Sequence, residues 1–434
     1  MISQALFILL LSAASFFAYR RFSFVRRNIL LGQPTKSVDN AKMRWSTMAR
    51  VALGQGKMFS RPFVAIMHLF LYVGFVVINI EVLEIVLDGV TGSHRIFAAL
   101  GIFYDYLIGS FEVLAALVLL ACVVFLARRN TLRIKRFWMR EMTAWPRTDA
   151  NIILVAEILL MSAFLTMNAS DFMLQSRGID HYVEAGSFPI SQVLLPVLEN
   201  FSDASLVLIE RGCWWFHIIG ILVFIVYVTY SKHLHIILAF PNTYYSKLVP
   251  AGTLGNLQSV TNEVKMMLDP SIPPPPADAA ANRFGAKDVF DLNWVNLMNA
   301  YSCTECGRCT TECPANQTGK LLSPRKIMMD TRDRLEEVGR CIDANKGQWS
   351  DDGKSLLRDY ISEEELWACT TCNACTQACP VNINPLEIIV DLRRYLIMEE
   401  SKSPESITTM FNNIENNGAP WAMSAADRAN WTNN

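Results

Sequence analysis

Two cysteine runs near the C-terminal end constrain this chain more than any other feature. Each run has the spacing C-x2-C-x2-C-x3-C, and a proline follows each one directly. The runs consist of Cys303, Cys306, Cys309 and Cys313, and of Cys369, Cys372, Cys375 and Cys379. This spacing is typical of ligands to [4Fe-4S] cubanes. It therefore predicts two such clusters, and it disfavours structural zinc, whose four ligands usually come as two separated pairs.

The fourth cysteine of such a run ligates the other cluster when two clusters are present. The first cluster is therefore expected on Cys303, Cys306, Cys309 and Cys379. The second is expected on Cys369, Cys372, Cys375 and Cys313. A disulfide scaffold is disfavoured because disulfides need an oxidising compartment. The remaining cysteines stand alone and are interpreted as packing residues: Cys122, Cys213 and Cys341.

The chain is expected to be all-α and to have two unlike halves. Five apolar spans each reach roughly the 20 residues that a membrane helix needs. They are Ile2–Tyr19, Phe63–Leu87, Leu107–Ala127, Ile152–Met173 and Trp214–Phe240. In the second half, helices are predicted at Pro324–Ile342 and Leu386–Glu399. The fold class is therefore a five-helix transmembrane bundle followed by a helical dicluster ferredoxin domain.

Four segments are expected along the chain. The transmembrane haem domain is assigned to residues 1–245, and an amphipathic segment with a proline-rich linker to residues 246–285. A helix at Leu254–Leu268 is expected on the membrane surface, and Ile272–Ala281 is expected to be a stiff, extended linker. The dicluster domain is assigned to residues 286–415, and a tail for partner docking to residues 416–434.

Charge in the loops predicts the orientation in the membrane. Residues 20–61 carry ten Lys and Arg, and residues 128–149 carry seven, whereas the other two loops hold only Arg95, Arg177 and Arg211. Positive loops stay on the cytoplasmic side. We therefore expect a multi-pass protein of the inner (plasma) membrane, with its N-terminus outside and its cluster domain in the cytoplasm, where thiols remain reduced.

Histidines within membrane spans are costly and usually functional. His217 and His235 are 18 residues apart, which is roughly 27 Å along one helix at 1.5 Å per residue, so they are expected near opposite membrane faces. His68 has a depth similar to that of His235, and this pair is the expected ligand set for haem b. A second haem would use His217 with His94. In the alternative interpretation, His233 and His235 are interfacial residues beside Lys232, and His94 is an ordinary loop residue.

Two further histidines, His181 and His233, are expected to be bystanders. Covalent haem is excluded because the sequence holds no C-x-x-C-H. One or two haems b are therefore expected, with quinone as the substrate that exchanges electrons with them. Four acidic residues in the spans are candidates for proton handling during quinone chemistry, and the sequence does not rank them: Glu81, Glu84, Glu112 and Glu157.

The membrane half resembles the gamma subunit of respiratory nitrate reductase and the cytochrome b subunit of heterodisulfide reductase. The helix count, His68, His217 and the segment Tyr230–His235 carry this resemblance. It implies b haems held by histidines of the second and fifth helices. This chain departs from the nitrate reductase pattern because its second span has one histidine rather than two.

The cluster half resembles the small iron–sulfur subunit of heterodisulfide reductase and the iron–sulfur part of glycolate oxidase. The two cysteine runs carry this resemblance. The segment Gly418–Trp431 is similar to the connector that leads, in larger relatives, into Cys-Cys-Gly repeats.

These features predict a membrane-bound electron-transfer subunit without a catalytic site for the final substrate. It would work with a separate cytoplasmic catalytic subunit, either a Cys-Cys-Gly protein of the heterodisulfide reductase type or a flavoprotein that oxidises a 2-hydroxy acid such as lactate or glycolate. No nucleic-acid partner is expected. A non-enzymatic redox sensor is the remaining alternative, but no signalling domain is visible. Trp421 and Trp431 are candidate docking anchors. The alternative is that the tail tryptophans fold back on the domain.

Overall fold

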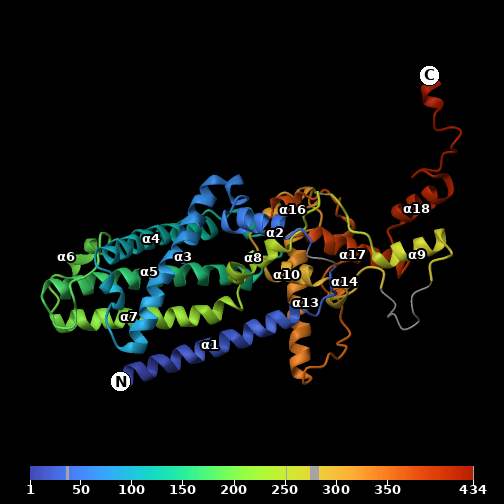
Figure 1. The fold of residues 1–434 in the computed structure, drawn as a ribbon. Coiled ribbons are helices and arrows are strands. Elements are labelled where there is room, and N and C mark those ends of the chain that lie inside the picture. Colours follow the sequence, from blue (N-terminus) through green and yellow to red (C-terminus); the bar gives the residue numbers. More distant parts are fainter. Residues whose placement is uncertain (36–38, 251, 274–282, 434) are drawn as a thin grey trace.

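The computed structural model describes residues 1–35, 39–250, 252–273 and 283–433. Within these residues the only β pairings are two isolated bridges. Figure 1 shows an elongated molecule, with long helices side by side at one end and a region of shorter helices at the other. The expected all-α class, with five apolar helices followed by a C-terminal helical domain, is confirmed.

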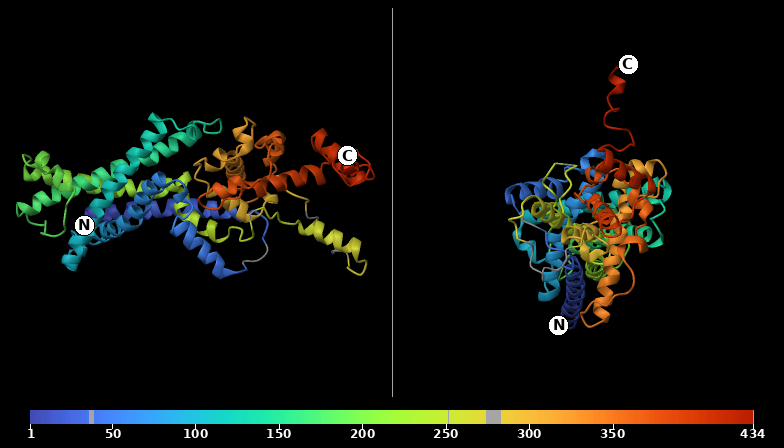
Figure 2. Two further views of the ribbon diagram at one scale, coloured as in Figure 1. Left: turned by 90° about the horizontal axis from the view of Figure 1, so that it is seen from above. Right: turned by 90° about the vertical axis from the view of Figure 1, so that its right-hand side faces the viewer.

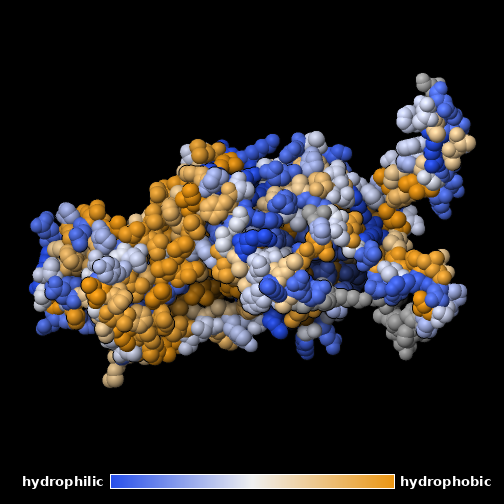
Figure 3. Space-filling model, turned by 45° about the horizontal axis from the view of Figure 1, so that its top comes forward, coloured by the Kyte–Doolittle hydropathy of each residue, from blue (hydrophilic) through white to orange (hydrophobic). Residues whose placement is uncertain are grey.

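The five apolar helices form a closed bundle. α1 packs against both α7 and α3, and the ring continues through α3–α4, α4–α5 and α5–α7 contacts. Their bounds are α1 Ile2–Ile29, α3 Pro62–Thr91, α4 Ile102–Leu126, α5 Ala144–Ser176 and α7 Asp203–Val228. All five are long and apolar enough to cross a membrane. Figure 3 shows a hydrophobic band over the bundle, between a more hydrophilic tip and the hydrophilic cluster half.

The fifth helix differs from the prediction at both ends. α7 begins at Asp203, where the side chain of Ser202 caps it, and ends at Val228 instead of continuing to Phe240. Ser231 is extended, and its hydroxyl accepts a hydrogen bond from His233 N. Such local side-chain bonds compete with the helix. The chain then forms a 3₁₀ turn at Lys232–Leu234, so the predicted spacing of His217 and His235 along one helix does not hold.

A separate helix, α8, follows this turn and lies with the short helix α2 where the bundle meets the cluster half. Their bounds are α2 Ala41–Met48 and α8 His235–Tyr244. At the opposite tip of the bundle lies α6, Leu195–Leu198.

The cluster half consists mainly of short helices around two longer ones. The longer ones, α13 and α17, match the predicted helices closely and pack against each other. The bounds are α10 Trp294–Tyr301, α11 Arg308–Thr311, α12 Pro314–Gln317, α13 Pro324–Ala344, α14 Leu356–Asp359, α15 Glu363–Trp367, α16 Ala374–Ala378 and α17 Pro385–Met398.

The two halves share one hydrophobic core. Val25 and Ile29, from the last turns of α1, and Leu234, from the turn before α8, lie in the core of the cluster half. Asn28 is wholly buried there, and its amide donates to Tyr301 Oη at 3.0 Å. The end of the first membrane helix is therefore built into the cluster half.

Two helices extend from the end of the molecule opposite the bundle. They are α9, Gln258–Leu268, and α18, Glu405–Asn417. Figure 1 and the left view of Figure 2 place α9 beyond the cluster half, away from the bundle. Its expected position on the membrane surface stays a prediction. Residues 274–282, which hold most of the predicted linker, lie outside the described residues.

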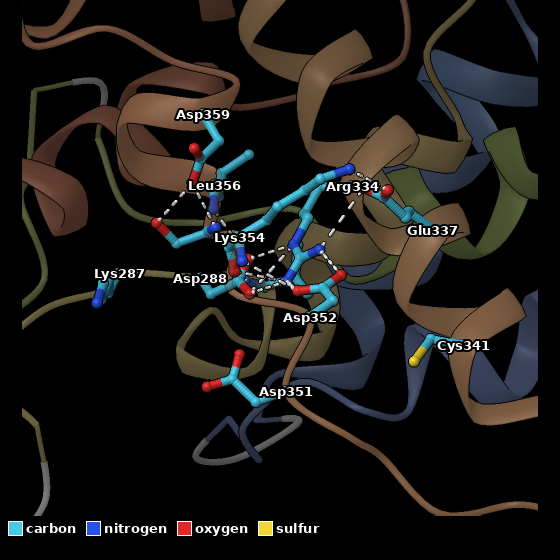
Figure 4. A network of polar contacts seen from close by, with 12 residues as sticks. Lys287, Asp288, Arg334, Glu337, Cys341, Asp351, Asp352, Lys354, Leu356 and Asp359 are labelled. Carbon is cyan, nitrogen blue, oxygen red and sulfur yellow. Dashed lines mark hydrogen bonds and ion pairs between the residues drawn. The ribbon is translucent and has the colours of Figure 1, made fainter. Parts of the chain in front are cut away.

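A buried arginine holds together three segments of the cluster half (Figure 4). Arg334 of α13 is wholly buried and forms ion pairs with Asp288 at 2.7 Å and with Asp352 at 2.6 Å. It also donates to the Lys354 carbonyl, and Asp288 in turn accepts a hydrogen bond from Leu356 N. The loop that follows α13 is thereby fixed on the start of the domain.

Replacing Arg334 by alanine is expected to destabilise the cluster half by about 3 kcal/mol, because Asp288 and Asp352 would lose their buried counter-ion. Thermal denaturation of the purified membrane protein, followed by circular dichroism, measures this effect. Arg340→Ala, on the exposed side of the same helix, is the matched control and should leave the transition unchanged. An unaltered transition in Arg334→Ala would contradict the structural role.

Candidate iron–sulfur centres and histidine cluster

The first three cysteines of the first run and the last cysteine of the second run line one cavity. This cavity encloses about 370 Å³ and is lined by Cys303, Cys306, Cys309 and Cys379, with Cys375 beside them. Glu305 and Gly307 both have a positive φ, which curls the loop around the cavity before α11 begins at Arg308. Pro314 then begins α12 and turns the chain away.

The other four cysteines line a second cavity. This cavity encloses about 320 Å³, and its cysteines are Cys313, Cys369, Cys372 and Cys375. Thr371 and Asn373 have a positive φ at the positions in the run that Glu305 and Gly307 occupy in the first. The two loops therefore repeat one backbone conformation. Cys375 lines both cavities, so the cavities are neighbours.

The buried thiols are poorly suited to remain without a metal. Burial raises the pKa of Cys303 to about 12 and that of Cys379 to about 11, and the neighbouring cysteines add to both shifts. Metal ligation requires thiolates, and a cationic iron–sulfur core would stabilise four of them together. Backbone N–H groups also point at sulfur, from Ile383 to Cys379 and from Thr371 to Cys369. The residues therefore fit [4Fe-4S] clusters.

The two cavities differ in their access to solvent. Cys303 and Cys379 of the first are buried, whereas Cys372 of the second is exposed. The second cavity is therefore closer to the surface. The three unassigned cysteines line neither cavity: Cys122 is buried in α4, Cys213 lies in α7, and Cys341 accepts a hydrogen bond from the Asn345 amide.

Three histidines gather where the bundle meets the cluster half. His68 interacts electrostatically with His235, and the rings of His233 and His235 are 5.3 Å apart. His233, expected to be a bystander, therefore belongs to the same group as the predicted pair. Burial lowers the pKa of His233 to about 3, so its imidazole is neutral at physiological pH.

In this group, two histidines already use one ring nitrogen. His68 Nδ1 lies 3.0 Å from Gln55 Oε1, and His235 Nδ1 lies 3.1 Å from the Lys232 carbonyl oxygen. Histidines that ligate a metal usually donate their second N–H to an oxygen in this way. These contacts fix the ring and leave Nε2 of each residue for iron. The residues therefore fit a bis-histidine haem.

The other predicted pair is not brought together in this way. His217 Nδ1 lies 3.0 Å from the Leu160 carbonyl oxygen. His94 instead lies 3.7 Å from Asp171 and contacts His181, with ring centroids 5.1 Å apart. Among the described residues, no hydrogen bond, ion pair or ring contact joins His94 to His217. A haem between them stays a prediction.

Two of the four acidic residues in the spans have structural partners. Glu84 accepts hydrogen bonds from Phe97 N and Tyr104 Oη. Glu112 accepts hydrogen bonds from Ser191 N and from other groups at the tip of the bundle. Glu81 is buried, and its Oε2 has no hydrogen-bond partner among the described residues. Glu157 is partly buried.

A buried ion network links the histidine turn to the first cysteine loop. Glu305, between Cys303 and Cys306, pairs with Lys232 and, at 2.7 Å, with Arg332. Burial alone would raise the pKa of Glu305, but these two cations overcome it and hold the pKa below its ordinary value. Lys232 also lies 3.7 Å from Asp149 of α5. Sequence patterns did not reveal this network because its members are far apart in the chain.

The helical fold and the paired cysteine cavities are those of a protein with two iron–sulfur sites. The family model described as "4Fe-4S dicluster domain" matches residues 302–383, so the chain contains such a domain. The chain is 27% identical to "Probable iron-sulfur-binding oxidoreductase FadF" of Bacillus subtilis over 99% of its length. It is 25% identical to "EtfAB:quinone oxidoreductase" of Syntrophomonas wolfei over 90% of its length.

The cluster half has further relatives. Over 28% of the chain, it is 31% identical to one component of the "Ferredoxin/F(420)H(2)-dependent CoB-CoM heterodisulfide reductase" of Methanosarcina acetivorans, and this match covers 60% of that component. The chain spans 61% of FadF and 54% of the Syntrophomonas protein. No solved structure matches. The homologues are thus iron–sulfur oxidoreductases and electron-transfer subunits.

The purified chain is expected to contain about eight iron atoms and eight acid-labile sulfides outside haem, because two cubanes hold four of each. Chemical analysis of iron, sulfide and zinc measures this. Cys372→Ser should lower both iron and sulfide, whereas Cys341→Ser, which replaces a cysteine outside both cavities, should retain the full content. Stoichiometric zinc with little sulfide would contradict the assignment.

Proposed function

We propose that this chain is a membrane-bound electron-transfer subunit that connects quinone with a separate cytoplasmic redox protein. The observation that carries the proposal is the sequence of sites along the molecule: a histidine cluster at the end of an apolar bundle, a buried cysteine cavity beside it, and a second cavity near the surface. Such a series suits the stepwise transfer of single electrons.

The first cluster is assigned to Cys303, Cys306, Cys309 and Cys379, and the second to Cys369, Cys372, Cys375 and Cys313. The two cavities support this division, because each contains three cysteines of one run and the fourth cysteine of the other. The exposure of Cys372 makes the second cluster the exit toward a soluble partner.

Haem b is assigned to His68 and His235. Their engaged Nδ1 atoms and their position at the bundle end support this pair. A b haem would supply a one-electron carrier between two-electron quinone chemistry and the one-electron clusters. His233 lies close enough to replace His235 as a ligand, which makes it the informative comparison in mutagenesis.

The first cavity adjoins the histidine cluster through short contacts. Arg308, which lines the cavity, donates to the Lys57 carbonyl at 3.3 Å, and Arg308 also interacts electrostatically with His68. Gln55, two residues before Lys57, contacts His68. The first cluster is therefore the nearer of the two to the haem.

The cluster half is assigned to the cytoplasm. Both strongly positive loops contact it: Arg61 pairs with Glu312, and Glu141, from the second loop, pairs with Arg325. Since positive loops remain inside, these contacts support an outside N-terminus and a position in the plasma membrane. The apolar surface of the bundle supports the membrane itself.

The extent of the similarities favours EtfAB as the kind of redox partner. The two relatives matched over nearly the whole chain include one named for EtfAB and quinone. The heterodisulfide reductase match covers only the cluster half, which keeps a Cys-Cys-Gly disulfide reductase as the second candidate. The flavin-dependent 2-hydroxy acid dehydrogenase has no such match among the relatives described above.

The C-terminal tail is assigned to partner docking. Trp421 is 54% exposed and Trp431 is 77% exposed, on a segment that extends away from the cluster half. Large exposed aromatic side chains are typical anchors of protein interfaces. Their distance from the bundle leaves them free to meet a soluble protein.

His68→Ala is expected to remove the assigned haem, because the other axial ligand alone cannot hold it. The pyridine haemochrome spectrum of the reduced purified protein measures haem content. His181→Ala is the matched control and should retain it. A full haem complement in His68→Ala would refute the assignment. Loss of haem in His233→Ala together with retention of haem in His235→Ala would make His233, rather than His235, the partner ligand of His68.

The isolated chain with a reduced quinone analogue is expected to show cluster reduction but no turnover of disulfides or 2-hydroxy acids. Adding EtfAB should give sustained quinone-linked electron transfer. Deletion from Gly418 onward should preserve haem and clusters but weaken EtfAB association at least tenfold, measured by titration of the rate. Full disulfide reduction by the chain alone would overturn the proposal.

A further inference from the structure

Three cations lie in or beside the wall of the first cysteine cavity without a carboxylate partner. They are Lys57, Arg136 and Arg308. Two of them belong to loops of the membrane half, and one belongs to the cysteine run itself. Among the described residues, none of the three takes part in an ion pair with an acidic side chain. Arg136 and Arg308 are buried, and Lys57 is half-buried. Buried cations without a counter-ion are costly, so this arrangement points to an anion in the cavity.

Arg308 is part of the cavity wall. It is 4% exposed and lies among the residues that line the cavity. Its Nη1 donates to the Lys57 carbonyl, so the cysteine run and the membrane half are joined at this point. Burial lowers the pKa of Arg308, while attraction to Cys306 opposes this shift and repulsion by Arg61 adds to it. The cation is held against the cysteines.

Arg136 lies beside the same cavity, in the loop between α4 and α5. It is 7% exposed, and its Nε is buried without a hydrogen-bond partner in the described part of the chain. Its carbonyl accepts a hydrogen bond from Arg325 at 2.7 Å, and a Cβ placed on Gly307 would lie 3.4 Å from Arg136 Cβ. The backbone of this loop therefore packs directly on the cysteine loop.

The electrostatic surroundings of Arg136 include a cysteine of the first cavity. Burial lowers the pKa of Arg136 to about 10, attraction to Cys306 opposes this shift, and repulsion by Arg61 and Arg308 adds to it. Burial likewise lowers the pKa of Lys57, and attraction to Cys379 opposes this shift. Lys57 Nζ donates to the Thr376 carbonyl at 3.3 Å. Both membrane-half cations thus face ligands of the first cluster.

The second cavity has different electrostatic surroundings. Arg393 donates to the carbonyl of Cys369 and interacts with that cysteine, and it comes from α17 within the cluster half. Burial and neighbouring cysteines raise the pKa of Cys313, Cys369 and Cys375, and Arg393 opposes the shift of Cys369. The asymmetry singles out the first cavity.

We propose that Arg136 and Lys57, supplied by the membrane half, raise the reduction potential of the first [4Fe-4S] cluster selectively. The inference rests on the proposed cysteine sets. When the cluster accepts one electron it gains one negative charge, which nearby cations stabilise. Net charge and hydrogen bonds at a cluster set its potential. Arg136 and Lys57 act on the cluster through its cysteine ligands, so they are positioning residues and not ligands.

The test is a redox titration of the full-length purified protein, followed by electron paramagnetic resonance. Arg136→Gln should make the midpoint potential of the first cluster more negative by at least about 59 mV. For a one-electron reduction, this shift corresponds to a tenfold change in the equilibrium constant. The second cluster should not shift. Arg136→Lys, which retains the charge, should largely restore the midpoint.

Controls separate charge from structure. Arg140→Gln changes an exposed arginine of the same loop and should leave both midpoints unchanged. The signal that Cys372→Ser removes identifies the second cluster. Iron and sulfide contents show that each variant holds both clusters, and Lys57→Gln repeats the test if Arg136→Gln loses one.

Three outcomes would overturn the inference. They are unchanged midpoints in Arg136→Gln and Lys57→Gln, equal shifts of both clusters, and a shift confined to haem, which would assign the cations to haem carboxylates instead. A wild-type protein without two cluster signals would instead overturn the proposed function, so the two failures are distinguishable.

Discussion

A buried charged contact fixes the position of the two halves of the molecule relative to each other. Glu305, inside the first cysteine run, pairs with Lys232 of the histidine turn and with Arg332 of α13. Breaking such a buried pair leaves a charge without its partner, at a cost of about 3–5 kcal/mol. The cysteine loop and the histidine turn are therefore fixed relative to each other, because in either half alone these charges would be exposed to solvent or left without a partner.

The same contact helps to hold the redox sites in fixed positions. His68 stands on α3, His233 on the short turn before α8 and His235 at the start of α8, while the cysteine loops run directly into α11 and α16. Sites on packed elements are held more precisely than sites on free loops. Cys375 lines both cavities, so the relative position of the cavities is fixed by one residue as well as by helix packing.

Local patterns predicted the parts of this structure that depend on local chemistry. Cysteine spacing indicated the cavities, and apolar runs indicated all five long helices. The end of α7 was missed because the sequence is apolar on both sides of a short polar segment, in which the Ser231 hydroxyl caps the turn that separates α7 from α8. The approach of Arg136 to Gly307 was not predictable, because it joins residues far apart in the chain through tertiary packing.

The first membrane helix has a consequence for how the protein is made. Asn28 is separated from its hydrogen-bond partners Tyr301 and Leu335 by 273 and 307 residues. At a synthesis rate of about 5–20 residues per second, those partners emerge only tens of seconds after α1. Until then the polar end of the helix can meet only water and lipid headgroups. The hydrogen bonds of Asn28 at the end of α1 thus form only after the cluster half has been synthesised. Biogenesis of the membrane half therefore depends on successful folding of the cluster half.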